Sequence, residues 1–193
     1  MTSISSLEDF HRKGFFGDYE NKNENDLIKI KEKKNLLIVQ LVQYKNSSIV
    51  IKDIDGLSPS DETLKVISNN ETRILWTGPK SWILTSTKKD LLKDINKIFN
   101  DFDFAITDLS HSRAIIELEG QFSKEVLKKG CPFNFNDLKK NKCVNSLFNG
   151  VAVTIDMIDD NPKKIRIFTL RSFGQSVYES ITDSCLEFGY KSL

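Results

Sequence analysis

The chain has 193 residues and a formal net charge of +1, with 28 basic against 27 acidic residues. This balance excludes a global field that would recruit nucleic acid or an acidic membrane, and 39% hydrophobic residues are typical of a globular domain with a core. No apolar run approaches the ~20 residues of a membrane helix, and the first residues lack the apolar segment of a secretory signal. Three widely spaced cysteines, Cys131, Cys143 and Cys185, fit neither a disulfide framework nor a metal motif, which favours a reducing, cytoplasmic location.

The polar, asparagine-rich residues 1–26 are predicted to form an N-terminal arm, and residues 27–193 a single globular domain. An alternative divides that domain into two subdomains that meet near residues 87–105. Phe10, Phe15 and Phe16 lie in the arm, which is unusual for a solvated tail. The arm therefore either docks on a surface or frays as a terminus.

Most of the remaining apolar runs predict strands. "NLLIVQLVQY" and "SIVIKDI", separated by "KNSS", predict a β-hairpin. "TRILWTGPKSWILTS" predicts two short strands broken at Gly78-Pro79. In "RAIIELEG" the apolar Ala114, Ile116 and Leu118 share one face, and Glu117 and Glu119 lie on the other, the pattern of a half-buried strand. Further strands are predicted in "FAITDLS", "VAVTIDMI" and "KIRIFTLR".

Three segments have helical periodicity. "TKKDLLKDINKIFN" offers Thr87 as a cap and Asp90 in the first turn, and "QFSKEVLKKGC" gives a short helix ended by Gly130. "SFGQSVYESITDSCLEFG" places Val177, Ile181, Cys185 and Phe188 on one face. Strands mixed with helices and several hairpins favour an α+β fold with mixed or antiparallel sheets.

The segment "TDLSHSR" concentrates the residue types of a catalytic site. Asp108, Ser110 and His111 are those of a hydrolase triad, but adjacent residues on a short turn usually point apart. A metal site lacks ligands, since the two histidines, His11 and His111, are a hundred residues apart. No glycine-rich nucleotide motif is present. We therefore expect no catalytic, cofactor-binding or metal-binding residue, and a strand corner at this segment.

Two other features allow a binding role. Trp76 and Trp82 flank the Gly78-Pro79 turn, where they are either interface anchors or core residues. A lysine group beside two phenylalanines could bind nucleic acid, but a solvated face is favoured because the chain is neutral and the group contains no arginine. That group consists of Lys128, Lys129, Lys139, Lys140 and Lys142 with Phe133 and Phe135.

Four motifs in order, "ILWTGPKSWIL", "TDLSHSRAIIELEG", "VLKKGCPFNF" and "LRSFGQSVYESITDSCLEFG", resemble the gamma subunit of heterotetrameric sarcosine oxidase. The resemblance implies a fold similar to the aminomethyltransferase (T-protein) and TrmE-like folate-binding domains. It implies an accessory chain without its own cofactor, whose alpha, beta and delta partners carry FAD, FMN, NAD and tetrahydrofolate. Such a complex demethylates sarcosine to glycine and passes the carbon to tetrahydrofolate or releases formaldehyde, forming hydrogen peroxide.

The alternative is a stand-alone folate-binding one-carbon protein, in which Asp108 or Glu117 would hydrogen-bond the pterin ring. A third interpretation, an RNA-binding module, depends on the lysines alone. Neither a nucleic acid nor a membrane is an expected partner. The residues expected to contact a partner or to anchor the fold are Phe10, Phe15, Phe16, Trp76, Trp82, Asp108, His111, Arg113, Arg171 and Phe173.

Overall fold

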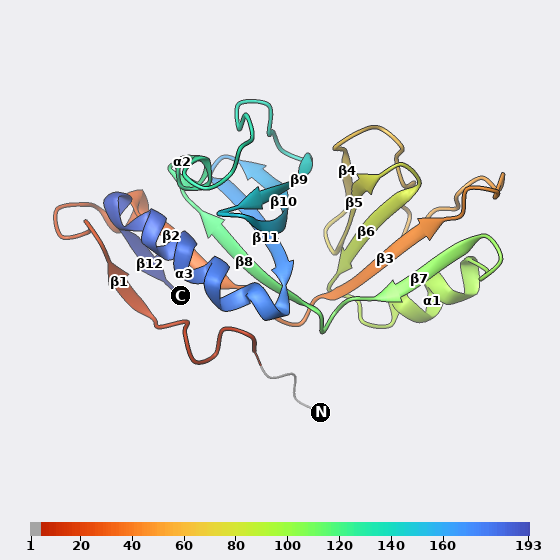
Figure 1. Cartoon of the computed structure of the whole chain (residues 1–193), viewed down its shortest axis with the longest axis horizontal. Coiled ribbons are helices and arrows are strands. Elements are labelled where there is room, and N and C mark those ends of the chain that lie inside the picture. Colours follow the sequence, from red (N-terminus) through yellow and green to blue (C-terminus); the bar gives the residue numbers. More distant parts are fainter. Residues whose placement is uncertain (1–4) are drawn as a thin grey trace. The chain divides into compact units, whose positions relative to one another are not determined.

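The computed structural model describes residues 5–193, so the first four residues of the expected arm lie outside the described residues. The chain forms two compact units, each built on its own β-sheet (Figure 1). Unit 1 comprises residues 1–34, 112–140 and 144–193, and unit 2 comprises residues 35–111 and 141–143. The chain thus passes between the units at 34–35, 111–112, 140–141 and 143–144, and residues 87–105, where the sequence suggests a possible division, lie within unit 2.

Unit 1 contains a seven-stranded sheet in the order β1-β12-β2-β8-β11-β10-β9. Strand β12 runs parallel to β2, while β1–β12, β2–β8, β8–β11 and β10–β11 are antiparallel. The strands are β1 (Gly14–Phe16), β2 (Ile28–Glu32), β8 (Arg113–Glu119), β9 (Cys143–Phe148), β10 (Val151–Asp160), β11 (Lys163–Leu170) and β12 (Tyr190–Ser192).

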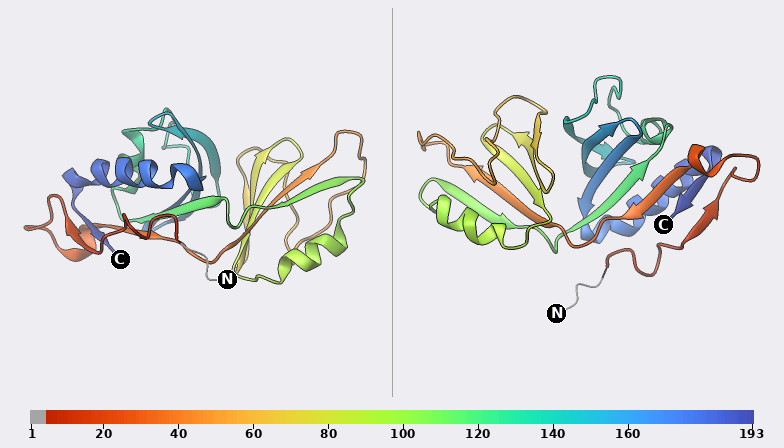
Figure 2. Two further views of the ribbon diagram at one scale, coloured as in Figure 1. Left: turned by 60° about the horizontal axis from the view of Figure 1, so that its bottom comes forward. Right: turned by 180° about the vertical axis from the view of Figure 1, so that it is seen from behind.

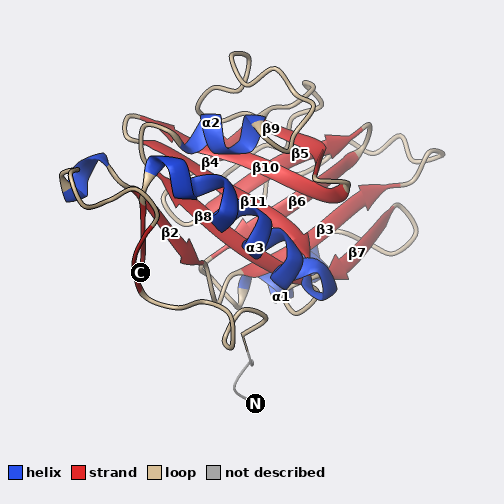
Figure 3. Cartoon of the chain, turned by 60° about the vertical axis from the view of Figure 1, so that its left-hand side comes forward, coloured by secondary structure: helices blue, strands red, loops and turns tan. Residues whose placement is uncertain are grey.

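Helices α2 (Ser123–Lys128) and α3 (Gly174–Cys185) lie over one face of this sheet (Figure 3). The Ala114 side of β8 faces α3, since a Cβ added at Gly174 would lie 3.0 Å from the Cβ of Ala114. By strand alternation, Glu117 and Glu119 point to the opposite face, as predicted, but residues 114–118 are buried on both faces, so the strand is not half-buried. Short 3₁₀ turns complete the unit at η1 (Glu24–Asp26), η2 (Arg171–Phe173) and η3 (Leu186–Phe188).

Unit 2 contains a five-stranded antiparallel sheet in the order β4-β5-β6-β3-β7. Helix α1 (Leu91–Ile98) lies along the strands (Figure 2), and its Leu91 and Ile95 enter a core with Trp82 and Phe104. The strands are β3 (Leu37–Gln43), β4 (Val66–Ser68), β5 (Thr72–Gly78), β6 (Ser81–Ser86) and β7 (Phe104–Asp108).

Two local predictions are wrong. "SIVIKDI" forms no strand, because both edges of β3 are already paired, to β6 and to β7, and Val50 is 84% exposed. Helix α1 begins at Leu91 rather than after Thr87, and the carboxylate of Asp90 forms an ion pair with Lys93 (2.7 Å) instead of capping the helix. The α+β class itself is confirmed, with two largely antiparallel sheets and three α-helices among residues 5–193.

None of the helices formed by residues 5–193 combines the length and the apolar character needed to cross a membrane.

Candidate partner interface

The polar segment 107–113 is a corner between β7 and β8. The Oδ1 atom of Asp108 accepts hydrogen bonds from the backbone N–H of Ser110 (2.9 Å) and from its hydroxyl (2.6 Å). The Ser110 hydroxyl oxygen in turn accepts the backbone N–H of Ile38 at 2.9 Å. The Ser110 proton is thus directed to a carboxylate within the turn and not to a histidine base, and His111 is exposed. These groups stabilise the corner and do not form a triad.

Arg113, the first residue of β8, lies half-buried in unit 1. Burial lowers the pKa of its guanidinium, and among the described residues of unit 1 no hydrogen-bond acceptor or carboxylate contacts it. It stands opposite Leu170 in the β8–β11 ladder, and the backbone N–H of Arg171 donates to the Ser112 carbonyl at 2.9 Å. Leu170 is 43% exposed and Phe173 is 46% exposed. We refer to Arg113, Leu170, Arg171 and Phe173 as the Arg113 patch.

The described part of the arm packs on unit 1. Strand β1 extends the sheet beyond β12, and the ring of Phe16 stacks on Tyr190 with centroids 5.2 Å apart. Phe15 is exposed beneath the ammonium of Lys191, 5.1 Å from the ring centroid, and Phe10 is also exposed. Only Phe10 and Phe15 of the three arm phenylalanines therefore offer a large free surface.

The two tryptophans face each other across the β5–β6 hairpin of unit 2. Trp82 is 1% exposed, and its indole N–H donates to the Ser60 carbonyl at 2.8 Å. Trp76 is half-buried at the edge of the same core, and its Nε1 has no acceptor among the described residues. Trp82 is thus placed as a core anchor, while Trp76 has part of its ring free for other contacts.

The carboxylate of Glu117 is the centre of a buried charge cluster in unit 1. It is 3% exposed and contacts Lys31 (3.0 Å), Arg166 (3.0 Å) and Lys164 (3.3 Å). Burial alone would raise its pKa, but the hydrogen bonds and charges of Lys31 and Arg166, with the charge of Lys164, lower it to about 2. Glu117 is therefore ionised and fully engaged, and it is not free to bind a ligand.

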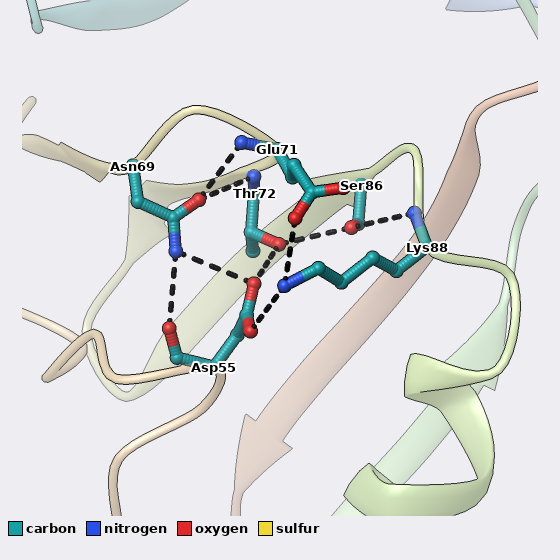
Figure 4. A network of polar contacts seen from close by, with 6 residues as sticks. All are labelled: Asp55, Asn69, Glu71, Thr72, Ser86 and Lys88. Carbon is teal, nitrogen blue, oxygen red and sulfur yellow. Dashed lines mark hydrogen bonds and ion pairs between the residues drawn. The ribbon is translucent and has the colours of Figure 1, made fainter.

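A polar network in unit 2 fixes the loop at Asp55 (Figure 4). The Asp55 carboxylate accepts from the Lys88 ammonium (2.8 Å) and the Thr72 hydroxyl (2.6 Å), and Lys88 also pairs with Glu71 (2.9 Å). The amide of Asn69 donates to the Asp55 carbonyl at 3.0 Å. The hydrogen bond from Lys88 is the largest cause of the lowered pKa of Asp55. All these groups satisfy one another, so the network has a structural role.

The cysteines are buried thiols, and members of the lysine group are ion-paired. Burial raises the pKa of Cys131 and raises that of Cys185 to about 12, which keeps both thiols protonated. Lys128 and Lys140 pair with neighbouring acids at 2.7 and 2.8 Å, and Phe135 is fully buried. Among residues 5–193, no group of three or more histidine, cysteine or acidic side chains converges as a metal site.

Sequence reasoning missed an exposed apolar tip on unit 2, made of Tyr44, Ile49, Val50 and Phe102. The Tyr44 backbone N–H donates to the Asp103 carbonyl at 2.8 Å, which brings the loop after β3 beside the loop before β7. Phe102 is 93% exposed. The apolar residues Ile49 and Val50 are visible in the sequence, but their composition predicts a strand. An apolar run that pairs with no other strand stays outside the core.

Comparisons with known proteins agree with the motif resemblance. No family model matches the chain. It is 24% identical to "Sarcosine oxidase subunit gamma" of Corynebacterium sp. (strain U-96) over 120 residues, which are 61% of this chain and 58% of that protein. The sequence match thus spans less than two thirds of the relative.

Two solved structures have a similar fold. A chain of the heterotetrameric sarcosine oxidase from Corynebacterium sp. U-96, in complex with pyrrole 2-carboxylate, matches with a TM-score of 0.78 and 20% identity, over 86% of this chain and 87% of that one. The glycine cleavage system aminomethyltransferase T from Bartonella henselae matches with a TM-score of 0.59 and 11% identity, over 82% of this chain and 46% of that one. The resemblance to sarcosine oxidase gamma subunits and the fold expected from it are confirmed.

Proposed function

We propose that this chain is the accessory, gamma-type subunit of a multisubunit, flavin-dependent sarcosine oxidase. Its partners would be alpha, beta and delta subunits that carry FAD, FMN, NAD and tetrahydrofolate and that demethylate sarcosine to glycine, passing the carbon to tetrahydrofolate. The observation that carries the proposal is the match to a chain of a heterotetrameric sarcosine oxidase over nearly the full length of both chains, with a TM-score of 0.78.

The side chains of this protein support an accessory role. Asp108 and Ser110 bond each other in a turn, Glu117 is neutralised by three cations, and the Cys185 thiol stays protonated. These candidate base, acid and nucleophile groups are thus engaged or protonated, which supports assigning the chemistry to the partners. This chain would brace them in a cytoplasmic complex.

Exposed aromatic residues on both units are the candidate contacts. Phe10 and Phe15 of the arm are exposed on unit 1, and Trp76 of the hairpin is half-buried on unit 2. The tip of unit 2 adds further apolar surface, with Val50 and Phe102 largely in solvent. Apolar and aromatic residues of this kind are enriched at the centres of protein interfaces.

Co-expression of the chain with the alpha, beta and delta subunits of the same organism tests the proposal. We expect one complex in size-exclusion chromatography coupled to light scattering, with one copy of each subunit and the flavin absorbance of the partners. The chain purified alone should be colourless. The proposal fails if the chain elutes as a separate monomer beside an assembled, active complex of the other three.

The alternative is a stand-alone folate-binding protein, which the fold match to an aminomethyltransferase favours. A pterin would need an available carboxylate, but Glu117 is buried among three cations and Asp108 bonds its own turn. Calorimetric titration of the isolated chain with tetrahydrofolate separates the two functions. Micromolar binding would support the alternative, and an absence of heat would favour the accessory role.

A further inference from the structure

Arg113 carries a charge that the described residues of unit 1 leave uncompensated. Its guanidinium is half-buried, yet these residues provide no acceptor for it. Arg166 on the neighbouring strand, by contrast, has its charge compensated by an ion pair with Glu117 at 3.0 Å. A partly desolvated cation without an anion costs free energy, which an incoming carboxylate would recover.

The surroundings of Arg113 have the composition of an interface centre. Directly opposed residues in an antiparallel ladder point to the same face, so Arg113 and Leu170 lie side by side. Leu170 leaves 43% of its surface in solvent, and Phe173, in the 3₁₀ turn that follows, leaves 46%. Arginine is among the residues enriched at binding hot spots.

Acidic residues are absent from the two segments that form the patch. The segments that form the patch, residues 112–116 and 168–175, contain Arg113 and Arg171 and no aspartate or glutamate. The bond from the Arg171 N–H to the Ser112 carbonyl holds the two segments together. The complementary surface must therefore be acidic at its centre and apolar at its edge.

We propose that the Arg113 patch is the docking site for a carboxylate side chain, flanked by apolar residues, on a partner subunit. This inference rests on the proposed function, because it names the chemistry of the partner in that assembly. The guanidinium fork binds the carboxylate in two parallel hydrogen bonds, and Leu170 excludes water beside them.

The test compares Arg113→Met, Arg113→Lys and Arg113→Glu with the wild-type chain, each titrated onto the purified alpha–beta–delta subcomplex at low and high salt. We expect Arg113→Met to weaken binding at least tenfold and to lessen its salt dependence. Arg113→Glu should weaken binding further, and Arg113→Lys less than Arg113→Met. Lys97→Glu, at an exposed side chain of α1, makes the same charge change and should bind as the wild type does.

The melting temperature of the isolated variants separates docking from folding. Arg113→Met removes an unpaired, partly buried charge and keeps the apolar stem, so the melting temperature should stay the same or rise. If binding falls only together with the melting temperature, Arg113 supports the fold and the inference is overturned. If Arg113→Glu binds like the wild type, this inference fails and the proposed function stands; if the wild type itself does not bind, both fail.

Discussion

Glu117 on β8 and Arg166 on β11 face each other as a register pair and form an ion pair, with Oε2 and Nη2 3.0 Å apart. The Arg166 side chain is 11% exposed and that of Glu117 is 3% exposed, so the pair lies largely out of water. Lys31 on β2 completes the row across three adjacent strands. The row ties the central strands of unit 1 together on the face opposite α3.

Replacing Glu117 by glutamine should lower the free energy of unfolding by about 3–5 kcal/mol, because three cations then lose their common carboxylate. Urea unfolding followed by far-UV circular dichroism measures the change, since both tryptophans lie in unit 2. Glu62→Gln is the matched control: Glu62 also pairs with a lysine but is 62% exposed, and its replacement should leave the curve unchanged. Equal midpoints for the two variants would show that the buried cluster contributes nothing.

The same carboxylate makes stability depend on pH. Its pKa falls from 4.5 to about 2 on folding, so its contribution is fully present above pH 4.5 and is lost as the pH falls toward 2. A depression of this size corresponds to about 3 kcal/mol. Unfolding free energies measured between pH 6 and pH 2 should therefore fall more steeply for the wild type than for Glu117→Gln. Parallel curves would contradict the lowered pKa.

The sequence predicted those elements whose local pattern is long enough to identify them. The patterns of β8, the β5–β6 hairpin and α3 each span six residues or more, and all three elements form, although the predicted helical face loses Phe188, which lies in η3 and is not buried. Strands β1 and β12 have three residues each; β1 forms by pairing with β12, and β12 by pairing with both β1 and β2. No local pattern identifies such strands.

The candidate interface was only partly predictable for the same reason. The motif "TDLSHSR" predicts that Arg113 follows a turn. Whether the Arg113 guanidinium has an acceptor depends on β11, which lies beside Arg113 in the sheet but far from it in the sequence. Ile49 and Val50 have the composition of a strand and lie in a loop, because pairing partners, and not propensity, decide which apolar runs enter a sheet.

Gly189 should tolerate no side chain, because it combines a positive φ of 69° with close contact to the arm. An added Cβ would lie 2.3 Å from the Asp18 carbonyl oxygen. We expect Gly189→Ala to cost about 2–5 kcal/mol, from left-handed strain together with overpacking. Gly150→Ala controls for the strain alone, since Gly150 has a φ of 83° with nothing within 4 Å, and it should cost only about 1–2 kcal/mol.

Hydrogen exchange locates the effect of Gly189→Ala. The backbone N–H of Asp18 donates to the Leu186 carbonyl at 2.8 Å, and this amide should lose its protection when the arm is displaced. Gly150→Ala should leave it protected. Equal stability of the two variants, with Asp18 still protected in both, would contradict the close packing of the arm.

Trp82 and Trp76 should respond differently to the same substitution, although they face each other across one hairpin. Trp82→Phe removes the donor to the Ser60 carbonyl and leaves a void in the core of unit 2, which should cost about 2–4 kcal/mol. Trp76→Phe removes an N–H that has no acceptor among residues 5–193, so it should cost less than about 1 kcal/mol. The remaining tryptophan in each variant reports the unfolding of unit 2 by fluorescence. Losses of similar size would show that both rings anchor the core equally, and Trp76 would then no longer be a candidate for partner contact.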